Sequence, residues 1–318
     1  MAKIPLWQDI VWQVLGYSQL QYEVFTSGGS LLYSGLAVAN PNDGNEINIR
    51  LNDIFADALY DRDITFSSAS GIAASESGRG VASFVVRNMS NYQTTQFDIV
   101  ADYSYNPYRA FASDPIIPIV DGRQDLLLTS WEGSLDVYKG NNSVISRSGA
   151  YTYCIGSDTL ADASYISASH RGGGSFRWDV RFTCADYVLH YINARGGWDS
   201  LLMLGKCSAG EEYTRHAVGR RYDNSTGTNH NNLGKVTFAN EVSKKWTLRT
   251  GFLTDEQSAK MYNVLGTTRA ILQDLNTNKR YPVAVTNSSY EEQTYRGNGN
   301  KMAQYEINVE LAQQHIRR

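Results

Sequence analysis

The sequence predicts a mainly β protein, built from β-sandwich domains and a C-terminal β-rich module that carries one short α-helix. The chain has 21 tyrosines, 27 glycines and 6 prolines among 318 residues. Aromatic side chains pack well on pleated sheets, and glycines suit the turns between strands. Hydrophobic and polar residues also alternate in many short runs, which is the period of a half-buried strand. Together these observations favour sheets.

Length and composition define the domain organisation and exclude some partners. A chain of 318 residues, with 42% hydrophobic and 19% charged residues, is long for one core. We predict an N-terminal sandwich at 1–110, a middle β region at 111–235 and a C-terminal module at 236–318. The formal net charge of -3 gives no basic surface for wrapping nucleic acid, so no nucleic-acid partner is expected.

The N-terminal domain reads as strands joined by short turns, with one helix. The residues at 26–30 and 40–45 are rich in Gly, Ser, Asn and Pro, which mark turns. The segment 64–79 is rich in Ser, Ala and Gly without periodicity, so it is predicted as a loop. The strands are predicted at 21–25, 31–39, 46–51, 82–87 and 96–103, with a short helix at 52–59.

The middle region continues with short strands and ends in a polar arm. A glycine run at 172–174 is predicted as a flexible tip. The residues from 211 to 234 are polar and rich in Arg and Asn, and we predict an extended or exposed arm there. The strands of this region are predicted at 116–120, 126–138, 151–155, 175–183, 187–193 and 200–204.

The C-terminal module has the clearest local signals. A strand at 245–253 is followed by Thr254, with Gln257 three residues later, which is the spacing of a capping box. Apolar residues then recur at helical spacing to residue 265, and Gly266 is well placed to end one helix at 255–265. A hairpin is predicted at 270–286 around the turn 276–279, and strict alternation at 304–311 predicts a final half-buried strand.

No sorting signal or membrane span is expected. Pro5 and Asp9 interrupt the start of the chain, so it does not resemble a signal peptide. No run of about eighteen apolar residues exists for a membrane helix. We therefore expect synthesis in a bacterial cytoplasm and no membrane partner. The three cysteines, Cys154, Cys184 and Cys207, are too few and too widely spaced for a disulfide framework, so they are expected to be reduced.

Candidate catalytic and metal-binding patterns are weak. The five histidines, at 170, 190, 216, 230 and 315, form no close pair for zinc, and no phosphate-binding loop, nucleophile elbow or dinucleotide fingerprint occurs. We expect no metal, no cofactor and no catalysis. Glycoside hydrolysis is a third hypothesis, because it needs paired carboxylates. The pairs considered are Asp98 with Asp102, Asp179 with Asp186, and Glu211 with Glu212.

The most motif-like run is residues 195–199, Arg-Gly-Gly-Trp-Asp. Paired glycines permit a tight turn, Trp198 can cover the end of a sheet, and Asp199 can accept hydrogen bonds from turn amides. This predicts a structural turn first and a binding role second. The candidate interface or binding residues are Arg195, Trp198, Asp199, Arg215, Arg220 and Arg221. Exposed tryptophans stacking on sugar rings would instead suit a carbohydrate-binding module.

Several segments together resemble structural proteins of tailed phages and prophages from Bacteroides-type bacteria. The resemblance spans most of the chain and rests on strand and turn patterns, so it supplies no functional residues. Its motifs lie at 32–35 with the Pro41-Asn42 turn, at 191–199, 250–257, 281–290 and 305–310.

The resemblance implies a virion component of the tail or baseplate, assembled as a homo-oligomeric ring with other tail proteins. Subunits of such rings contact one another through complementary surfaces, and the polar segments 64–79 and 211–234 are expected to order against a neighbour. The alternative is a module that binds carbohydrate or a host receptor, such as a host-surface glycan, for which the tyrosine and tryptophan content is the motive.

Overall fold

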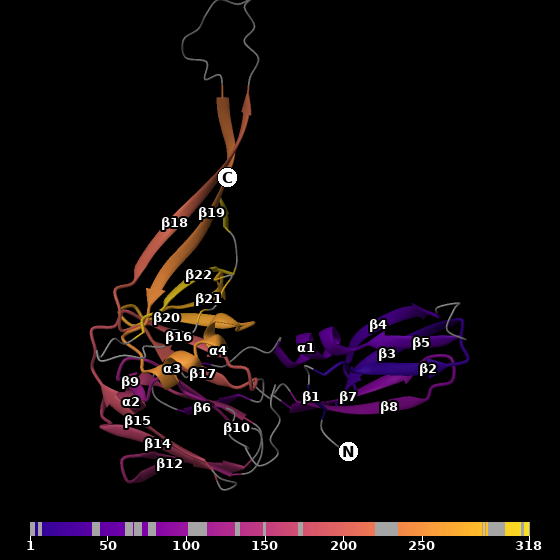
Figure 1. Cartoon of the computed structure of the whole chain (residues 1–318), viewed down its shortest axis with the longest axis horizontal. Helices are drawn as coiled ribbons and strands as arrows, with labels where there is room; N and C mark the ends of the chain where they lie inside the picture. The colour runs from indigo at the N-terminus through magenta and orange to yellow at the C-terminus, as the bar shows by residue number, and fades with distance from the viewer. Residues whose placement is uncertain are drawn as a thin grey trace, which may run out of the picture. The chain divides into compact units, whose positions relative to one another are not determined.

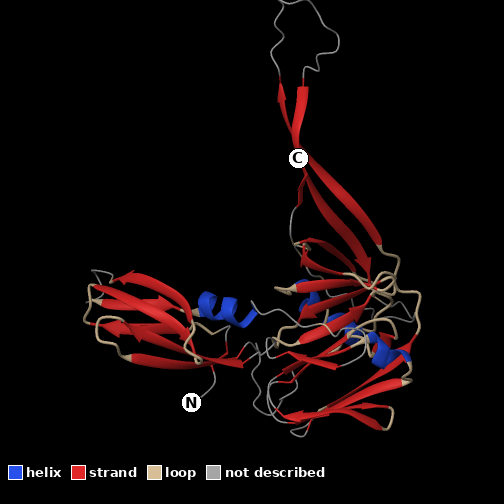
Figure 2. Cartoon of the chain, turned by 180° about the vertical axis from the view of Figure 1, so that it is seen from behind, coloured by secondary structure: helices blue, strands red, loops and turns tan. Residues whose placement is uncertain are grey.

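A computed structural model of the chain is mainly β, with a few short helices (Figure 2). It describes residues 4–5, 8–39, 45–60, 66, 72–75, 81–100, 113–130, 134–148, 151–170, 174–219, 235–287, 289, 291, 303–312 and 315–317. These residues form two compact units. Unit 1 consists of Met1–Thr183 and His190–Leu202, and unit 2 of Cys184–Leu189 and Met203–Arg318.

The N-terminal part of unit 1 is a sandwich of two sheets (Figure 1). One sheet has the order β1-β8-β7-β3-β4, and the other pairs β2 with β5. The helix α1 adds Phe55 to the core between them, where its ring stacks on that of Phe84 at 4.4 Å between centroids. The elements are β1 (Ile4–Pro5), β2 (Val11–Leu15), β3 (Gln19–Thr26), β4 (Leu31–Val38), β5 (Glu46–Arg50), α1 (Asn52–Tyr60), β7 (Val81–Asn88) and β8 (Thr94–Val100).

The predicted loop at 64–79 contains a strand, so that prediction is wrong for part of its length. β6 (Ile72–Ser75) pairs antiparallel with β13 (Tyr151–Ile155), from Ile72 opposite Ile155 to Ser75 opposite Thr152. Its sequence, Ile-Ala-Ala-Ser, is short and has no alternation. The strand is defined by a partner about eighty residues away in sequence, which local periodicity cannot reveal.

The second part of unit 1 is another sandwich. Its sheets have the orders β10-β13-β6 and β12-β11-β14-β15-β9. Both contribute to one core, for example Leu128 and Tyr153 from the first and Val137 and Trp178 from the second. The elements are β9 (Ile119–Asp121), β10 (Leu126–Ser130), β11 (Ser134–Lys139), β12 (Asn142–Ser148), β13, α2 (Ser157–Ala161), β14 (Tyr165–His170) and β15 (Ser175–Arg181).

Three of these elements were missed in the sequence. α2 has five residues and begins after Gly156 with no side-chain cap, so it has neither the length nor the cap that would indicate a helix. β12 and β14 flank β11 in the sheet. Both are rich in Ser, and Ser is not among the residue types that mark strands.

The division between the units runs through β16 (Tyr187–Ile192), which is followed in unit 1 by β17 (Trp198–Leu202). Strands with a glycine turn between them were predicted at these positions. In unit 2 the strand order is β16-β20-β21-β22-β19-β18, and β23 pairs with β19. The elements are β18 (Ser208–Gly219), β19 (Lys235–Arg249), α3 (Asp255–Ala259), α4 (Tyr262–Leu265), β20 (Ala270–Asp274), β21 (Arg280–Val285), β22 (Glu306–Leu311) and β23 (His315–Arg317).

The single helix predicted at 255–265 is two short helices. The capping box of Thr254 and Gln257 is present, as predicted. The helix α3 nevertheless ends at Ala259, and the chain turns at Lys260 and Met261 before α4 begins. The predicted hairpin is formed by β20 and β21, and the predicted final strand is β22, with Ile307 and Val309 buried. No helix in the described part of the chain is long and apolar enough to cross a membrane.

Candidate functional site

The turn at 193–199 in unit 1 is fixed by hydrogen bonds from both of its ends. The Oδ1 atom of Asn193 accepts from the backbone N–H groups of Arg195 (2.8 Å) and Gly197 (3.1 Å). Gly196 has a φ of 74°, a conformation that favours glycine. Trp198 is buried, and its backbone N–H donates to Oγ1 of Thr129 at 2.9 Å. The turn is therefore a rigid structural element, as the paired glycines predicted.

Asp199 is a buried carboxyl at the base of this turn, with 2% of its surface exposed. It accepts from Nδ2 of Asn193 at 2.7 Å and from the backbone N–H of Asp114 at 3.0 Å. Burial raises the pKa of Asp199 to about 7, although the hydrogen bonds from Asn193 and Asp114 favour the ionised form. The carboxyl therefore holds the segment around Asp114 against the turn and titrates near neutral pH.

Arg195 is occupied within the same unit. Its guanidinium lies 3.4 Å from the Asp114 carboxylate, and both side chains are mostly buried. Ser113 completes the arrangement by donating from Oγ to the carbonyl oxygen of Trp198 at 3.1 Å. The turn residues thus contact segment 113–114 of their own unit. The sequence missed Ser113, Asp114 and Thr129 because they lie about seventy to eighty-five residues away along the chain.

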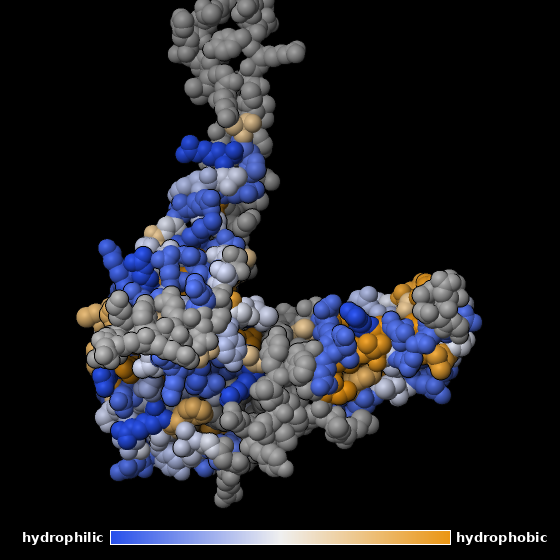
Figure 3. Space-filling model, in the orientation of Figure 1, coloured by the Kyte–Doolittle hydropathy of each residue, from blue (hydrophilic) through white to orange (hydrophobic). Residues whose placement is uncertain are grey.

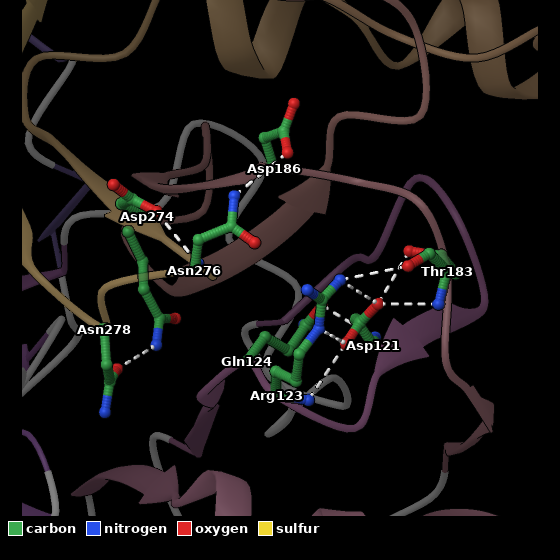
Figure 4. A network of polar contacts seen from close by, with 9 residues as sticks. Asp121, Arg123, Gln124, Thr183, Asp186, Asp274, Asn276 and Asn278 are labelled. Atoms are coloured by element: carbon green, nitrogen blue, oxygen red, sulfur yellow. Dashed lines mark hydrogen bonds and ion pairs between the residues drawn. The ribbon is translucent and has the colours of Figure 1, made fainter.

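A second buried carboxylate, Asp121, organises the polar network of Figure 4 in unit 1. It accepts from the backbone N–H and Oγ1 of Thr183, at 2.8 and 2.7 Å, and from the backbone N–H and Nε of Arg123, at 3.0 and 2.9 Å. Burial alone would raise its pKa, but the bonds from Arg123 and Thr183 outweigh burial and lower it. The ionised Asp121 carboxylate thus links β9 to the residues that follow β15.

The other network in Figure 4 belongs to unit 2 and fixes the β20–β21 turn. Asn276 donates from Nδ2 to Asp186 at 3.0 Å, and its backbone N–H donates to Oδ1 of Asp274 at 2.9 Å. Asn278 has a φ of 53° and accepts from Nε2 of Gln273 at 2.9 Å. These groups satisfy turn amides, and no cluster of His, Cys, Asp or Glu suited to a metal ion occurs among the described residues.

The carboxylate pairs considered for hydrolysis have separate local partners. Asp98 accepts from Oγ of Ser83 at 2.6 Å, and Asp102 lies outside the described residues. Asp179 lies between Arg177 and Arg181, at 3.6 and 3.5 Å. Glu211 and Glu212 are neighbours on β18, so their side chains point to opposite faces.

The tryptophans, histidines and cysteines have mostly structural positions. Trp12, Trp178, Trp198 and Trp246 are buried, and Trp7 and Trp131 lie outside the described residues. His170 and His190 are buried, His216 lies 3.1 Å from Glu241, and His230 lies outside the described residues, as does the side chain of His315. All three cysteines are free, as expected, although Cys184 is exposed.

The strand β18 of unit 2 forms a long hairpin with β19, and we call this hairpin the arm. β18 is 12 residues long and forms the last strand of its sheet, and every residue from 208 to 215 is exposed. β19 pairs with β22 only over Lys245–Arg249, so the hairpin continues beyond that sheet (Figure 1). Within the predicted arm, residues 211–215 are exposed, and residues 211–219 belong to strand β18. Residues 220–234 lie outside the described residues.

The predicted site residues therefore fall into two groups. Arg195, Trp198 and Asp199 share the turn of unit 1. Arg215 is exposed on the arm in unit 2, and Arg220 and Arg221 lie outside the described residues. The arm is the better candidate for a functional surface, because its groups face solvent while those of the turn are already engaged.

Comparisons with known proteins do not assign a family. No family model matches the chain, and no curated protein matches it. Among solved structures, the crystal structure of Salmonella alpha-2-macroglobulin reacted with methylamine is similar at 9% identity and a TM-score of 0.17. The alignment covers 94% of this chain and 28% of that chain. A TM-score this low does not indicate a shared fold.

Proposed function

We propose that this chain is a structural subunit that assembles through its arm, and specifically a tail or baseplate subunit of a tailed phage. The observation that carries the proposal is the exposure of β18 on both faces and along one edge over residues 208–215. A free edge presents a row of unpaired N–H and C=O groups, and native proteins normally shorten or cover such edges. A strand of 12 residues is about twice the usual length.

The arm has little to stabilise it alone. A two-stranded ribbon is marginally stable in water. Residues Lys235 to Ala239 of β19 are aligned with β18, whereas the described pairings of β19 with β22 and β23 begin at Asn240. Ion pairs such as Lys245 with Glu212 are exposed and contribute little to stability. Contact with a neighbouring subunit would add a further strand at the free edge of β18 or a second layer over its exposed faces.

The effect of the charges of β18 depends on the register of pairing. An antiparallel self-pairing centred between Glu211 and Glu212 would set two like charges opposite each other, which is unfavourable, whereas one centred between Tyr213 and Thr214 would set Glu212 opposite Arg215. Contact with a different surface of the next subunit is heterologous, and heterologous contacts generate rings when the rotation closes. The ring geometry and the tail location are parts of the proposal taken from the resemblance to phage structural proteins.

Glycan binding through stacked tryptophans has no support among the described residues, because the four tryptophans described are buried. The exposed Tyr213, with 51% of its surface exposed, lies on the arm and is equally suited to a protein contact.

The test combines an assembly assay with the particle itself. Purified chain, followed by mass photometry and negative-stain electron microscopy, should form defined oligomers. Tyr213→Lys on the arm should weaken them, whereas Gln96→Lys on exposed β8 should not. Mass spectrometry of phage particles that encode the chain should find it in several copies per particle. A chain that is absent from particles, or oligomers that do not respond to Tyr213→Lys, would overturn the proposal.

A further inference from the structure

We propose that strand β4 is a second interface, through which two copies of this chain pair edge to edge. β4 is the last strand of the five-stranded sheet in the N-terminal sandwich. Its sequence, Leu-Leu-Tyr-Ser-Gly-Leu-Ala-Val, has no charge and no proline over eight residues. β4 therefore lacks the charges and the prolines that protect many natural edge strands, and its pairing with β3 is irregular only at Leu32.

The exposed side chains of β4 are large and apolar. Leu36 and Val38 are 65% and 64% exposed, and Leu31 is 55% exposed. On the outer face, Leu36 lies opposite Gln21 and Val38 opposite Gln19 of β3. In Figure 3, hydrophobic residues gather on the N-terminal sandwich, over the region where Figure 1 draws α1, β3 and β4. An apolar surface of this kind on a regular element indicates a contact site.

The core-facing side of β4 is also incompletely covered. Tyr33 lies opposite buried Val24 on that side, yet 44% of its surface is exposed. A hollow of about 490 Å³ opens beside it, lined by Tyr22, Leu32, Tyr33, Arg50, Asp53, Ile54 and Ala58. One further strand added to β4 would therefore cover apolar groups on both faces of the sheet.

Self-complementarity identifies a second copy as the occupant. An antiparallel pairing of β4 with itself about Gly35 keeps the faces matched, with Leu36 opposite Ser34, Val38 opposite Leu32 and Tyr33 opposite Ala37. β4 brings no charge of its own into this pairing, and a two-fold contact of one patch with itself is the commonest symmetric interface. A partner strand with ordinary charge content would lose hydration against the uncharged β4 without gaining an ion pair from it.

Gly35 suits the centre of such a pairing. A Cβ there would lie 2.6 Å from Cε1 of Tyr33 and 2.9 Å from Cζ of Tyr22. The Tyr33 ring therefore leans over the glycine towards Tyr22, with 5.9 Å between the two ring centroids. In a two-fold pair, one such ring from each copy would cover the glycines at the axis, which is how aromatic residues compensate for glycine in sheets.

The experiment measures hydrogen exchange of the full chain against protein concentration, with sedimentation velocity for the oligomeric state. The amides of Leu31–Val38 should gain protection as dimers form, whereas those of Thr94–Val100 should not change. Leu36→Lys places a charge on an exposed position, so folding should be retained in circular dichroism, and the dissociation constant should rise about tenfold or more. Gln96→Lys is the matched control and should leave it unchanged.

Two outcomes would overturn the interface. One is a hydrogen-exchange rate in β4 that does not depend on protein concentration. This result is expected if the chain is a monomer or if β4 binds a different protein. The other is a dimer that persists unchanged in Leu36→Lys. Oligomers that respond to Tyr213→Lys on the arm but not to Leu36→Lys would leave the proposed function standing while this interface fails. Oligomers that respond to Leu36→Lys but not to Tyr213→Lys would support this interface while the proposed function fails.

Discussion

Replacement of Asp199 by asparagine should remove a pH dependence from the stability of unit 1. The pKa of Asp199 is raised from 3.8 to about 7, mainly by burial. Because the folded state binds this proton more tightly than the unfolded state, the contribution to stability is fully present below pH 3.8 and is lost as pH rises towards 7. This rise in pKa, about three powers of ten in the affinity for the proton, corresponds to about 4 kcal/mol of folding free energy. Above pH 7 the loss should be complete.

The Asp199→Asn variant should have a different profile. Its amide cannot ionise, so the pH-dependent contribution of residue 199 to stability disappears. If the asparagine oxygen takes the place of Oδ2, which accepts from both Asn193 and Asp114, its NH2 group takes the place of Oδ1 and meets the Asp114 N–H, now 3.2 Å from Oδ1; this should cost about 1–3 kcal/mol at every pH. We expect the variant to be less stable than wild type near pH 4.5. The difference should shrink as pH rises and should be abolished or inverted by pH 8.

The assay is urea unfolding followed by circular dichroism between pH 4.5 and 8.5. The two units can unfold separately, so the transition that responds to the substitution is the one to analyse. Buried His170, whose pKa is lowered by burial, is present in both proteins and cancels in the difference. Asp179→Asn, the same change at a half-exposed carboxylate of the same unit, is the matched control for the substitution itself. A difference for Asp199→Asn that stays constant over this pH range would refute the reasoning.

Three further substitutions test single contacts. Gly35→Ala should destabilise the N-terminal sandwich by about 1–3 kcal/mol, since its Cβ would overlap Tyr33; an unchanged melting temperature would contradict this. Asp121→Ala should cost about 3 kcal/mol or more of stability at pH 7, because it leaves buried donors such as the Thr183 amide unpaired. The pKa of Asp121 is lowered, so this cost should shrink as the pH falls, which urea titrations would measure. Thr254→Ala should cost about 1 kcal/mol and speed amide exchange in α3, and equal exchange rates would argue against the capping box.

Local chemistry predicted the elements whose signals lie within a few residues. The capping box at Thr254 was predicted because both of its partners lie within one turn. The β20–β21 hairpin was predicted because turn residues separate two alternating runs. The helix predicted at 52–59 is present as α1 (Asn52–Tyr60). Elements defined by distant partners, such as β6, could not be found in this way.

The turn at 193–199 was predicted only in part. The glycines and Asp199 indicated a tight turn, and the turn is present. Its partners Asp114 and Thr129 come from elsewhere in unit 1, and no local pattern marks them. The raised pKa of Asp199 has the same origin, because it depends on burial by the whole unit rather than on neighbouring residues.

The position of a strand at the edge of a sheet is a further property that alternation does not reveal. An alternating pattern tells which side chains share a face, but it does not tell which strand comes last. The sequence of β4 predicts an ordinary strand and that of β18 an extended or exposed arm, and only the strand order identifies both as edges. Once that order is known, their sequences become informative, because β4 is uncharged while β18 carries Glu211 and Glu212. The uncharged edge suits pairing with its own copy, and the charged edge suits a surface of complementary charge.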